Sequence, residues 1–271
     1  MRRSETMSAR PRSRRKARRL PALNRIHQVD CLEGMGGLPE ECVDLVFTSP
    51  PYADLRAYAR IRPDDYVGWF LPRAYQMKRV LKPTGSLILN INDRCVKKRR
   101  HLYVHKLVIA LVEIVGFHLI ETYIWHKPNA MPGAYGRRLK DAFEYVFWLG
   151  KSTEVKFFPE AVGRPYKGSG SRRTGRIEHN CGRGIDDANC YGRGWSDPGN
   201  VVTVPIGSHG SDHPAVMPEA LAEFFIRLST KRGDLVLDPF AGSGTTLRAA
   251  RTLARRGLGF DVRKGIARHV E

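Results

Sequence analysis

Along most of this chain, short apolar runs alternate with longer segments in which apolar residues recur every three to four positions. The short runs predict buried β-strands, and the longer segments predict amphipathic α-helices. This alternation indicates an α/β fold with a mostly parallel sheet, because parallel neighbours need a crossover between them. Predicted strands cover residues 25–30, 43–48, 86–92, 117–127, 142–149, 235–238 and 257–261, with a strand-like segment at 199–205; predicted helices cover 31–38, 64–81, 102–115 and 219–230, with further helices after Thr246 and at the chain end.

The apolar run Val43–Phe47 stops at two consecutive prolines, Pro50 and Pro51. Proline cannot donate to a sheet ladder and pushes the preceding residue out of the helical region, so the strand should end in a stiff, extended turn. Open α/β sheets bind ligands at the carboxyl edge of their strands. The turn offers the Ser49 hydroxyl, the Pro50 carbonyl and the ring of Tyr52. Two acceptors beside a flat ring suit a planar base with an exocyclic amino group, although a rigid surface turn is the simpler interpretation.

A second constellation follows the apolar strand that ends at Asp238. Residues 238–246 read Asp-Pro-Phe-Ala-Gly-Ser-Gly-Thr-Thr and predict a tight turn that enters a helix. Glycines let the backbone approach a ligand, and the hydroxyls and amides at a helix start can bind it. The turn is neither a Walker loop nor the three-glycine dinucleotide fingerprint. The next strand ends at Asp261, where a carboxylate can accept both hydroxyls of a ribose.

The chain length suits one α/β domain with an insertion. We expect a disordered basic arm at 1–20 and an insertion at 151–200 that separates two halves of the domain, 21–150 and 201–271. The segment Lys82–Gly85 predicts a turn that stops the preceding helix. Asp30 ends a strand on the same sheet edge as Ser49, so it either reaches a ligand or caps the following helix.

The formal net charge of +19 indicates a polyanionic partner, most commonly nucleic acid. Nine of the first twenty residues are Lys or Arg, and the lack of apolar periodicity there predicts disorder. The arm has no hydrophobic signal region, although its Arg- and Ser-rich composition also fits an organellar transit peptide. No apolar run is long enough to span a membrane, so no membrane span is expected. We expect a cytoplasmic, DNA-associated prokaryotic protein, with organellar targeting as the alternative.

The five cysteines are odd in number and scattered, so no disulfide framework is expected. His179, Cys181 and Cys190 lie near one another in sequence, but their spacing matches no standard zinc pattern. We therefore expect no metal site.

Arginine-rich segments provide the candidate DNA contacts. The 151–200 region is too poor in aliphatic residues to form its own core, and it interleaves guanidinium groups with aromatic rings, which is typical of a segment that orders on DNA. The Gly- and Pro-bearing loop 128–140 lies at a predicted sheet edge. The cationic loop 95–101 is either a contact to the DNA backbone or a solvated loop. The candidate DNA-binding residues are Arg99, Arg137, Arg138, Arg172, Arg173 and Arg176.

Residues 48–52, Thr-Ser-Pro-Pro-Tyr, together with residues 238–246 resemble the motifs of the DNA amino-methyltransferases that use S-adenosylmethionine. The order, with the catalytic motif first and the glycine motif last, is similar to that of the permuted β group. This order implies a catalytic half at 21–150, a target-recognition insertion at 151–200 and a cofactor-binding half at 201–271. The resemblance runs from about Ile26 to Asp261 and includes residues 79–86, 125–129 and 213–218. It implies a Rossmann-like methyltransferase fold, with a mostly parallel seven-stranded sheet covered by helices on both faces.

The resemblance also implies roles for individual residues. Ser49, Pro50, Pro51 and Tyr52 would hold a flipped base, Asp261 would bind the ribose of S-adenosylmethionine, and Asp30 with Cys31 would bind its adenine. The other implied cofactor-binding residues are His213, Pro214, Met217, Asp238, Phe240, Ala241, Gly242, Ser243, Gly244, Thr245 and Thr246.

In this family a serine at the first motif position occurs mostly in enzymes that methylate cytosine at N4, and aspartate mostly in those acting on adenine N6. We therefore expect a site-specific methyltransferase acting on cytosine N4 in double-stranded DNA. The alternatives are an adenine N6 enzyme, an RNA or protein-amide methyltransferase, and an inactive DNA-binding paralogue. Because relatives are often dimers, the resemblance also allows a homodimer.

Overall fold

The computed structural model describes residues 18–53, 61–130, 138–165, 195–207, 217–263 and 265. Their main feature is an eight-stranded, mostly parallel sheet in which only β7 runs against both of its neighbours. The expectation of seven strands is exceeded by one short edge strand, which forms in the strand-like segment 199–205. In sheet order the strands are β1 (Arg25–Gln28), β12 (Arg256–Asp261), β11 (Leu235–Asp238), β2 (Val43–Thr48), β3 (Leu81–Ile91), β7 (Phe143–Gly150), β6 (His118–His126) and β10 (Val201–Thr203).

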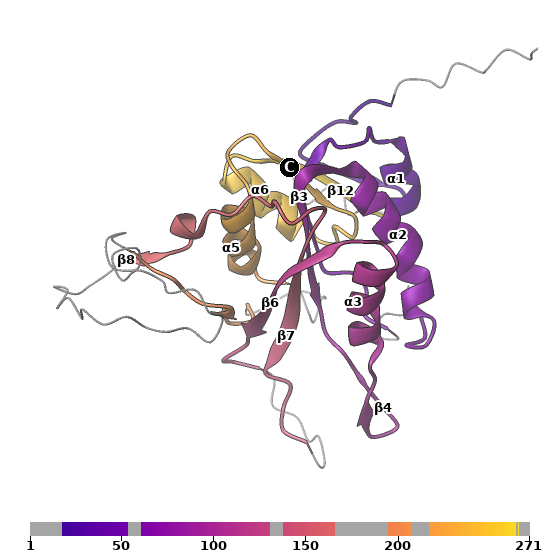
Figure 1. The fold of residues 1–271 in the computed structure, drawn as a ribbon, viewed down its shortest axis with the longest axis vertical. Coiled ribbons are helices and arrows are strands. Elements are labelled where there is room, and N and C mark those ends of the chain that lie inside the picture. Colours follow the sequence, from indigo (N-terminus) through magenta and orange to yellow (C-terminus); the bar gives the residue numbers. More distant parts are fainter. Residues whose placement is uncertain are drawn as a thin grey trace, which may run out of the picture.

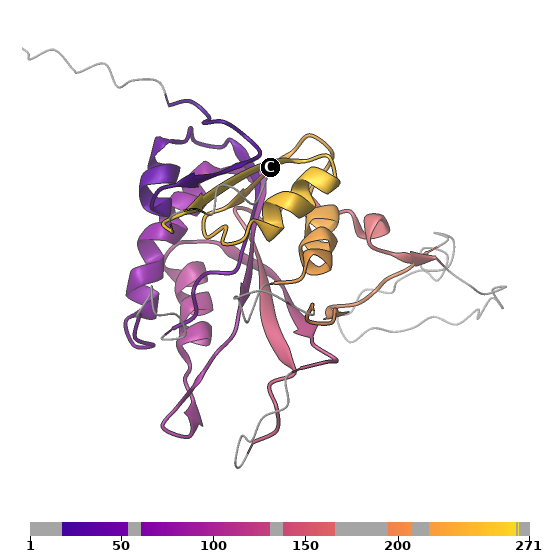
Figure 2. The same cartoon turned by 180° about the vertical axis from the view of Figure 1, so that it is seen from behind.

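Helices cover both faces of the sheet (Figure 1), as Figure 2 shows from behind. One face carries α1 (Cys31–Gly37), α2 (Tyr66–Val80) and α3 (Tyr103–Glu113); the other carries α5 (Glu219–Ser229) and α6 (Thr245–Thr252). Successive strand residues point to opposite faces, so Val46 packs with the first group of helices while Leu45 and Phe47 pack with the second. This explains why β2 is apolar at nearly every position.

Helix α2 ends at Val80, but the predicted turn at Lys82–Gly85 does not form as a separate element. These residues belong to β3, which already begins at Leu81. Leu81 pairs with Val43, whereas the next pair joins Ser86 to Leu45, so the strand bulges between these points. The Pro-Thr-Gly sequence is accommodated in this bulge, where the strand ladder needs fewer donors.

A buried carboxylate joins β2 and β11 near their amino ends. Asp44 accepts hydrogen bonds from Lys82 Nζ at 2.7 Å, Lys156 Nζ at 2.8 Å and the Leu235 amide at 2.9 Å. Burial alone would raise the pKa of Asp44, but these donors outweigh burial and lower it. The two strands that carry the sequence motifs are thereby held as one unit.

Two small two-stranded antiparallel sheets extend from the domain (Figure 1). One pairs β4 (Cys95–Val96) with β5 (Arg99–Arg100), so the predicted cationic loop is a β-hairpin. The other, after the short 3₁₀ helix η1 (Pro159–Ala161), pairs β8 (Arg164–Pro165) with β9 (Trp195–Ser196) as antiparallel strands. Both strands lie within the predicted target-recognition insertion 151–200.

Several expectations fall on residues outside those described: most of the arm 1–20, the core of the 151–200 insertion with its His179, Cys181 and Cys190, and the helix at the chain end. Cys31, Cys42 and Cys95 are free thiols. In the part of the chain that the structure describes, no helix is long and apolar enough to cross a membrane.

Candidate active site at the carboxyl edge of the sheet

The two sequence motifs meet at the carboxyl edge of the sheet. β2 and β11 are parallel neighbours with Val46 opposite Leu237, so both strands end at the same place. There the Thr48 hydroxyl donates to Asp238 Oδ1 at 2.6 Å. A direct bond therefore ties the start of the Ser-Pro-Pro-Tyr turn to the start of the glycine turn.

Asp238 is the centre of this junction. Its Oδ2 accepts from the Thr246 hydroxyl at 2.7 Å, and its Oδ1 also accepts from the Phe240 amide at 3.0 Å. The side chain is almost fully buried, and burial raises its pKa to about 6 even though these donors favour the charged form. One carboxylate thus fixes the end of β2, the glycine turn and the first turn of α6.

The glycine turn needs glycine at two positions. Gly242 has φ +54° and Gly244 has φ +81°, a region in which side chains are strained. Gly244 also stands at the N-cap of α6. Next to it, the Ala241 amide donates to the Phe260 carbonyl at 3.0 Å, so the turn is fastened to the end of β12.

Asp261, at the end of β12, lies beside the glycine turn. Its Oδ2 accepts from the Gly242 amide at 2.9 Å, and both oxygens accept from the Arg263 guanidinium at 3.0 Å. A polar ligand that reaches this carboxylate must therefore share it with Arg263. A carboxylate that accepts hydrogen bonds, beside glycine backbone that carries no side chain, suits the ribose hydroxyls of a nucleoside cofactor.

Asp30 and Cys31 begin α1 on the same side. Asp30 caps the helix through a 2.8 Å bond from the Leu32 amide to its Oδ1, so the predicted capping role is confirmed. Its other oxygen lies 3.7 Å from Arg73. The Cys31 thiol is buried, and burial raises its pKa to about 11 despite the nearby Arg73. Arg73 in turn lies over the ring of Trp69, which packs against Phe240 of the glycine turn.

The remaining predicted cofactor residues are placed as follows. The hydroxyls of Ser243 and Thr245 lie 3.3 Å apart, and Arg248 donates to the Ser243 carbonyl at 2.6 Å. Met217 is partly buried and packs on the α5 and α6 side of the sheet. His213 and Pro214 lie outside the described residues. The roles assigned to all of these residues stay predictions.

The proline turn itself is firmly held. Pro50 is buried, and the Pro51 carbonyl accepts from the Tyr66 hydroxyl at 3.0 Å. The hydroxyls of Ser49 and Tyr52 lie 3.3 Å apart. Tyr52 then donates to Glu144 Oε2 at 2.6 Å, which connects the motif to the antiparallel strand β7.

Sequence reasoning missed part of the polar cluster around this turn. Glu144 forms an ion pair with Lys127 at 3.0 Å and accepts from Asn90 Nδ2 at 3.1 Å. Asn90 interrupts the apolar run Leu87–Ile91 in β3, and Glu144 lies between two aromatic residues in the apolar strand β7. A charged or amide side chain inside an apolar run is the signal that could have identified Asn90 and Glu144.

The candidate DNA-binding arginines fall into two groups. Arg99 is exposed in the β4–β5 hairpin, and Arg138 lies 3.8 Å from Asp141 just before β7. Figure 1 shows both segments extending beyond the same end of the sheet. Arg137, Arg172, Arg173 and Arg176 lie outside the described residues.

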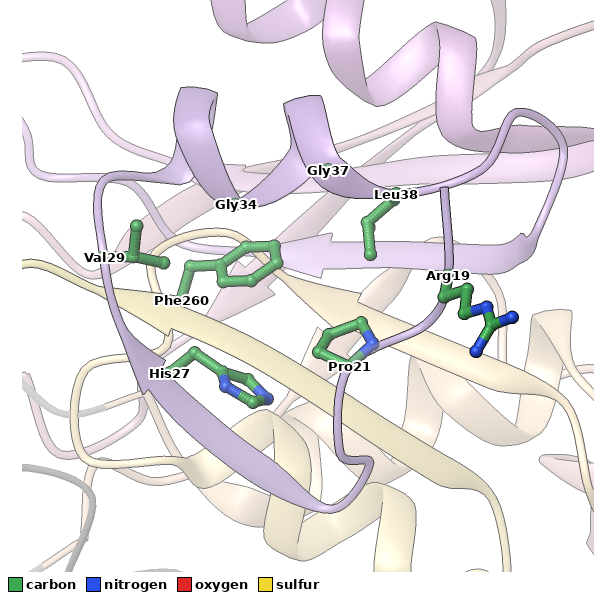
Figure 3. Close-up of a pocket in the computed structure, with 8 residues that line it drawn as sticks. All are labelled: Arg19, Pro21, His27, Val29, Gly34, Gly37, Leu38 and Phe260. Carbon is green, nitrogen blue, oxygen red and sulfur yellow. The ribbon is translucent and has the colours of Figure 1, made fainter. Parts of the chain in front are cut away.

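A separate open pocket of about 200 Å³ lies between α1, the edge strand β1 and the end of β12 (Figure 3). Its lining includes Arg19, His27, Leu38 and Phe260. Neither sequence motif contributes to it, and we assign it no role in catalysis.

The edge described above fits S-adenosylmethionine. Gly242 has φ +54°, where a side chain would be strained, so the turn presents bare backbone at this edge. Asp261 supplies acceptors, and Phe240 with Trp69 supplies an apolar aromatic surface. Among the described residues, no group of His, Cys, Asp and Glu side chains suits a metal ion.

The chain is similar to known DNA methyltransferases. The family model described as DNA methylase matches residues 43–271. The type II methyltransferase M.PvuII of Proteus hauseri is 30% identical over 267 residues, covering 86% of this chain and 78% of the relative. M.BglII of Bacillus subtilis is 28% identical over 247 residues, covering 89% of this chain and 66% of the relative.

Solved structures agree. The cytosine-N4-specific PvuII DNA methyltransferase matches with a TM-score of 0.71 and 26% identity, over 90% of this chain and 84% of that one. A putative DNA modification methylase of Thermus thermophilus, complexed with S-adenosyl-L-methionine, matches with a TM-score of 0.61 and 28% identity, over 91% and 90%. With the motifs joined at one edge of this fold, the chain belongs to the DNA methylase family of N6- and N4-amino-methyltransferases.

Proposed function

We propose that this protein transfers a methyl group from S-adenosylmethionine to the N4 amino group of a flipped cytosine at specific sites in double-stranded DNA. The bond between Thr48 and Asp238 carries the proposal, because it holds the base-binding turn against the glycine turn. The choice of cytosine is supported by Ser49 at the first motif position and by the cytosine-N4-specific relative.

The cofactor would lie along the glycine turn. Gly242 and Gly244 would face it with bare backbone, Asp261 would accept its ribose hydroxyls, and Asp30 with Cys31 would lie by its adenine. When bound, the cofactor supplies a methyl group on a positively charged sulfur. Arg263 would have to yield at least one of its contacts to Asp261 as the ribose arrives.

The protein's part in the reaction is orientation and electrostatics. The amino lone pair of cytosine is delocalised into the ring, so the nitrogen is a poor nucleophile. Acceptors at Ser49 Oγ and the Pro50 carbonyl would draw the amino hydrogens out of the ring plane and stabilise the positive charge that develops on nitrogen. Holding the nitrogen about 3 Å from the methyl carbon would supply much of the remaining rate acceleration. Stacking on Tyr52 would offset about 1–3 kcal/mol of the cost of flipping.

DNA would approach the end of the sheet from which the β4–β5 hairpin and the segment before β7 extend. The net charge of +19 favours a polyanionic partner in general and supplies no sequence specificity. A homodimer stays a prediction from the family resemblance, and a cytoplasmic location stays a prediction from the sequence.

The test is to incubate unmethylated genomic DNA with the protein and methyl-labelled cofactor, and to identify the labelled nucleosides by mass spectrometry. We expect N4-methylcytosine at a recurring sequence. N6-methyladenine would overturn the assignment of the base, and label found only in RNA or protein would overturn DNA as the substrate. No transfer at all would match an inactive DNA-binding protein.

A further inference from the structure

A line of polar side chains crosses the sheet beside the proline turn. Ser49 and Tyr52 follow β2, Asn90 lies in β3, Glu144 in β7, and Lys127 directly after β6. These four strands are consecutive neighbours in the sheet, which is why residues so far apart in sequence meet. Glu144 is at the centre, with both of its carboxylate oxygens hydrogen-bonded.

Glu144 determines which group donates in the hydrogen bond from Tyr52 to Glu144 and, through it, in the one between Ser49 and Tyr52. The Glu144 carboxylate accepts in each of its hydrogen bonds among the described residues, from Tyr52, Asn90 and Lys127. The 2.6 Å contact must therefore use the single hydrogen of the Tyr52 hydroxyl. Burial, followed by the charge of Glu144, raises the pKa of Tyr52 well above its usual value, so this hydrogen stays on the phenol.

The next link follows by the same reasoning. Because the Tyr52 hydrogen is committed to Glu144, the 3.3 Å contact with Ser49 can form only if Ser49 donates. Once its one hydrogen points at Tyr52, Ser49 Oγ presents only lone pairs to any other partner. The Asn90 amide is oriented too, since its nitrogen faces two acceptors, Glu144 Oε2 and the Tyr145 carbonyl. Its buried oxygen has no partner among the described residues and is a further acceptor in the cluster.

We propose that Glu144 is a positioning residue: acting through Tyr52, it makes Ser49 a hydrogen-bond acceptor and so selects a base that carries an amino group. This inference deepens the proposed function and rests on it. A cytosine amino group donates to Ser49, whereas the carbonyl oxygen at the same position of uracil meets a second acceptor. Leaving such a pair unsatisfied in a buried site typically costs about 1–3 kcal/mol.

The test compares Glu144→Gln with wild type and with Glu113→Gln, a control that alters an exposed carboxylate at the end of α3. The duplex probes carry the methylation site mapped for the wild-type protein, with the target cytosine or a uracil placed opposite an abasic position so that neither base is paired. We expect wild type to bind the cytosine probe at least about tenfold more tightly. In Glu144→Gln the single amide oxygen should keep the charged partner Lys127, which leaves the amide NH2, a donor, facing Tyr52. This variant should therefore lose most of the preference and at least about tenfold in kcat, with cofactor affinity by calorimetry unchanged.

Tyr52→Phe provides an independent variant because it keeps the ring and removes the relay hydroxyl. We expect it to lose the preference for cytosine over uracil as well. In the double variant, Glu144→Gln should add little to the loss of kcat caused by Tyr52→Phe, since both break the same chain of hydrogen bonds. Losses that multiply, or a Tyr52→Phe protein that keeps the wild-type preference, would overturn the inference.

The same samples separate this inference from the proposed function. The nucleoside methylated by wild type reports the proposed function, and the change in base preference between variants reports the role of Glu144. A wild type that forms N6-methyladenine would refute cytosine as the target, and also the role of Glu144 as stated for cytosine over uracil. A wild type that forms N4-methylcytosine while Glu144→Gln keeps its preference and kcat would refute the role of Glu144 alone.

Discussion

At the scale of single residues, the site depends on carboxylates whose partners come from distant parts of the chain. Asp238 has a folded-state pKa of about 6 against an ordinary value of 3.8, because it is buried. The folded protein therefore holds a proton on this group more tightly than the unfolded chain does. The resulting contribution to stability is present below about pH 4 and is lost as the pH rises through 6.

Thr48→Val tests the bond that joins the motifs. The variant keeps the shape of the side chain but removes a donor to the charged form of Asp238. We expect a loss of about 1.5–3 kcal/mol in the free energy of unfolding at pH 8 and a smaller loss at pH 5, where Asp238 is protonated. Urea unfolding at both pH values measures this, with the exposed Thr252→Val as control. An equal loss at both pH values would show that the bond to ionised Asp238 is not what Thr48 contributes.

Asp261→Ala tests the cofactor end of the site. The carboxylate lies beside Gly242 and is the acceptor best placed for a ribose. Removing it should weaken binding of S-adenosylmethionine by at least about tenfold in calorimetry, because a hydrogen bond to a charged group is worth about 1.5–3 kcal/mol. Binding to duplex DNA alone should be unchanged. Unaltered cofactor affinity would remove Asp261 from the cofactor site.

The sequence predicts site residues only where they stand in contiguous motifs. Ser49, Tyr52, Asp238 and Asp261 are candidates because prolines, glycines and strand ends mark them locally, and the structure places them at one edge of the sheet. Glu144 stands in no such motif. Its charge inside an apolar run marks it as unusual, but its contact with Tyr52 depends on the order of strands in the sheet. No local pattern indicates that β7 would run antiparallel and place this residue against Tyr52.

At the scale of elements, close packing explains details that periodicity does not contain. The short helix α1 lies directly on Phe260 of β12, and a Cβ at Gly34 would stand only 2.6 Å from its ring. The ring is almost fully buried, and a shift away from a new Cβ would have to disturb its packing in the core. Because Phe260 precedes Asp261, this contact also supports the position of the predicted ribose acceptor.

Gly34→Ala should therefore destabilise the protein even though alanine favours helices. We expect a loss of about 1–3 kcal/mol from overpacking, measured by urea unfolding. Gly36→Ala in the same helix is the matched control, since a Cβ there meets nothing within 4 Å and should be neutral or slightly stabilising. If the two variants behaved alike, helix propensity rather than contact with Phe260 would determine the effect.

The cationic hairpin is a second element whose geometry carries a prediction. Lys97 and Lys98 form its turn with φ +48° and +66°, and both are exposed. Non-glycine residues are uncommon in this conformation, as two-residue hairpin turns normally use asparagine or glycine. Contact with DNA phosphates would explain why lysines occupy both positions.

The double variant Lys97→Ala, Lys98→Ala should weaken DNA binding for all sequences alike. We expect the slope of log affinity against log salt to fall in magnitude by about 2, close to one for each phosphate that a lysine no longer neutralises. Fluorescence anisotropy across a salt series measures this, and Lys231→Ala, near the opposite end of the sheet, serves as control. An unchanged slope would place the hairpin away from the DNA.

At the scale of the whole molecule, the class of fold could be predicted because the alternation of strand and helix is a property of the chain itself. The order of strands could not be read in detail. β1 and β2 are consecutive in sequence, yet β12 and β11 lie between them, and this interleaving is what brings Asp238 and Asp261 to the same edge as Ser49. The bulged start of β3 was missed because proline and glycine signal a turn in most contexts.

The most direct measurement is a structure of the protein with a duplex that carries its unmethylated target site and a cofactor analogue that cannot transfer its group. We expect the analogue along the glycine turn and the flipped cytosine on Tyr52, with its N4 nitrogen within hydrogen-bonding distance of Ser49 Oγ and facing the position of the methyl group. A base and cofactor held in separate cavities, or a base that avoids Ser49, would contradict the proposal that the two motifs form one methyl-transfer site.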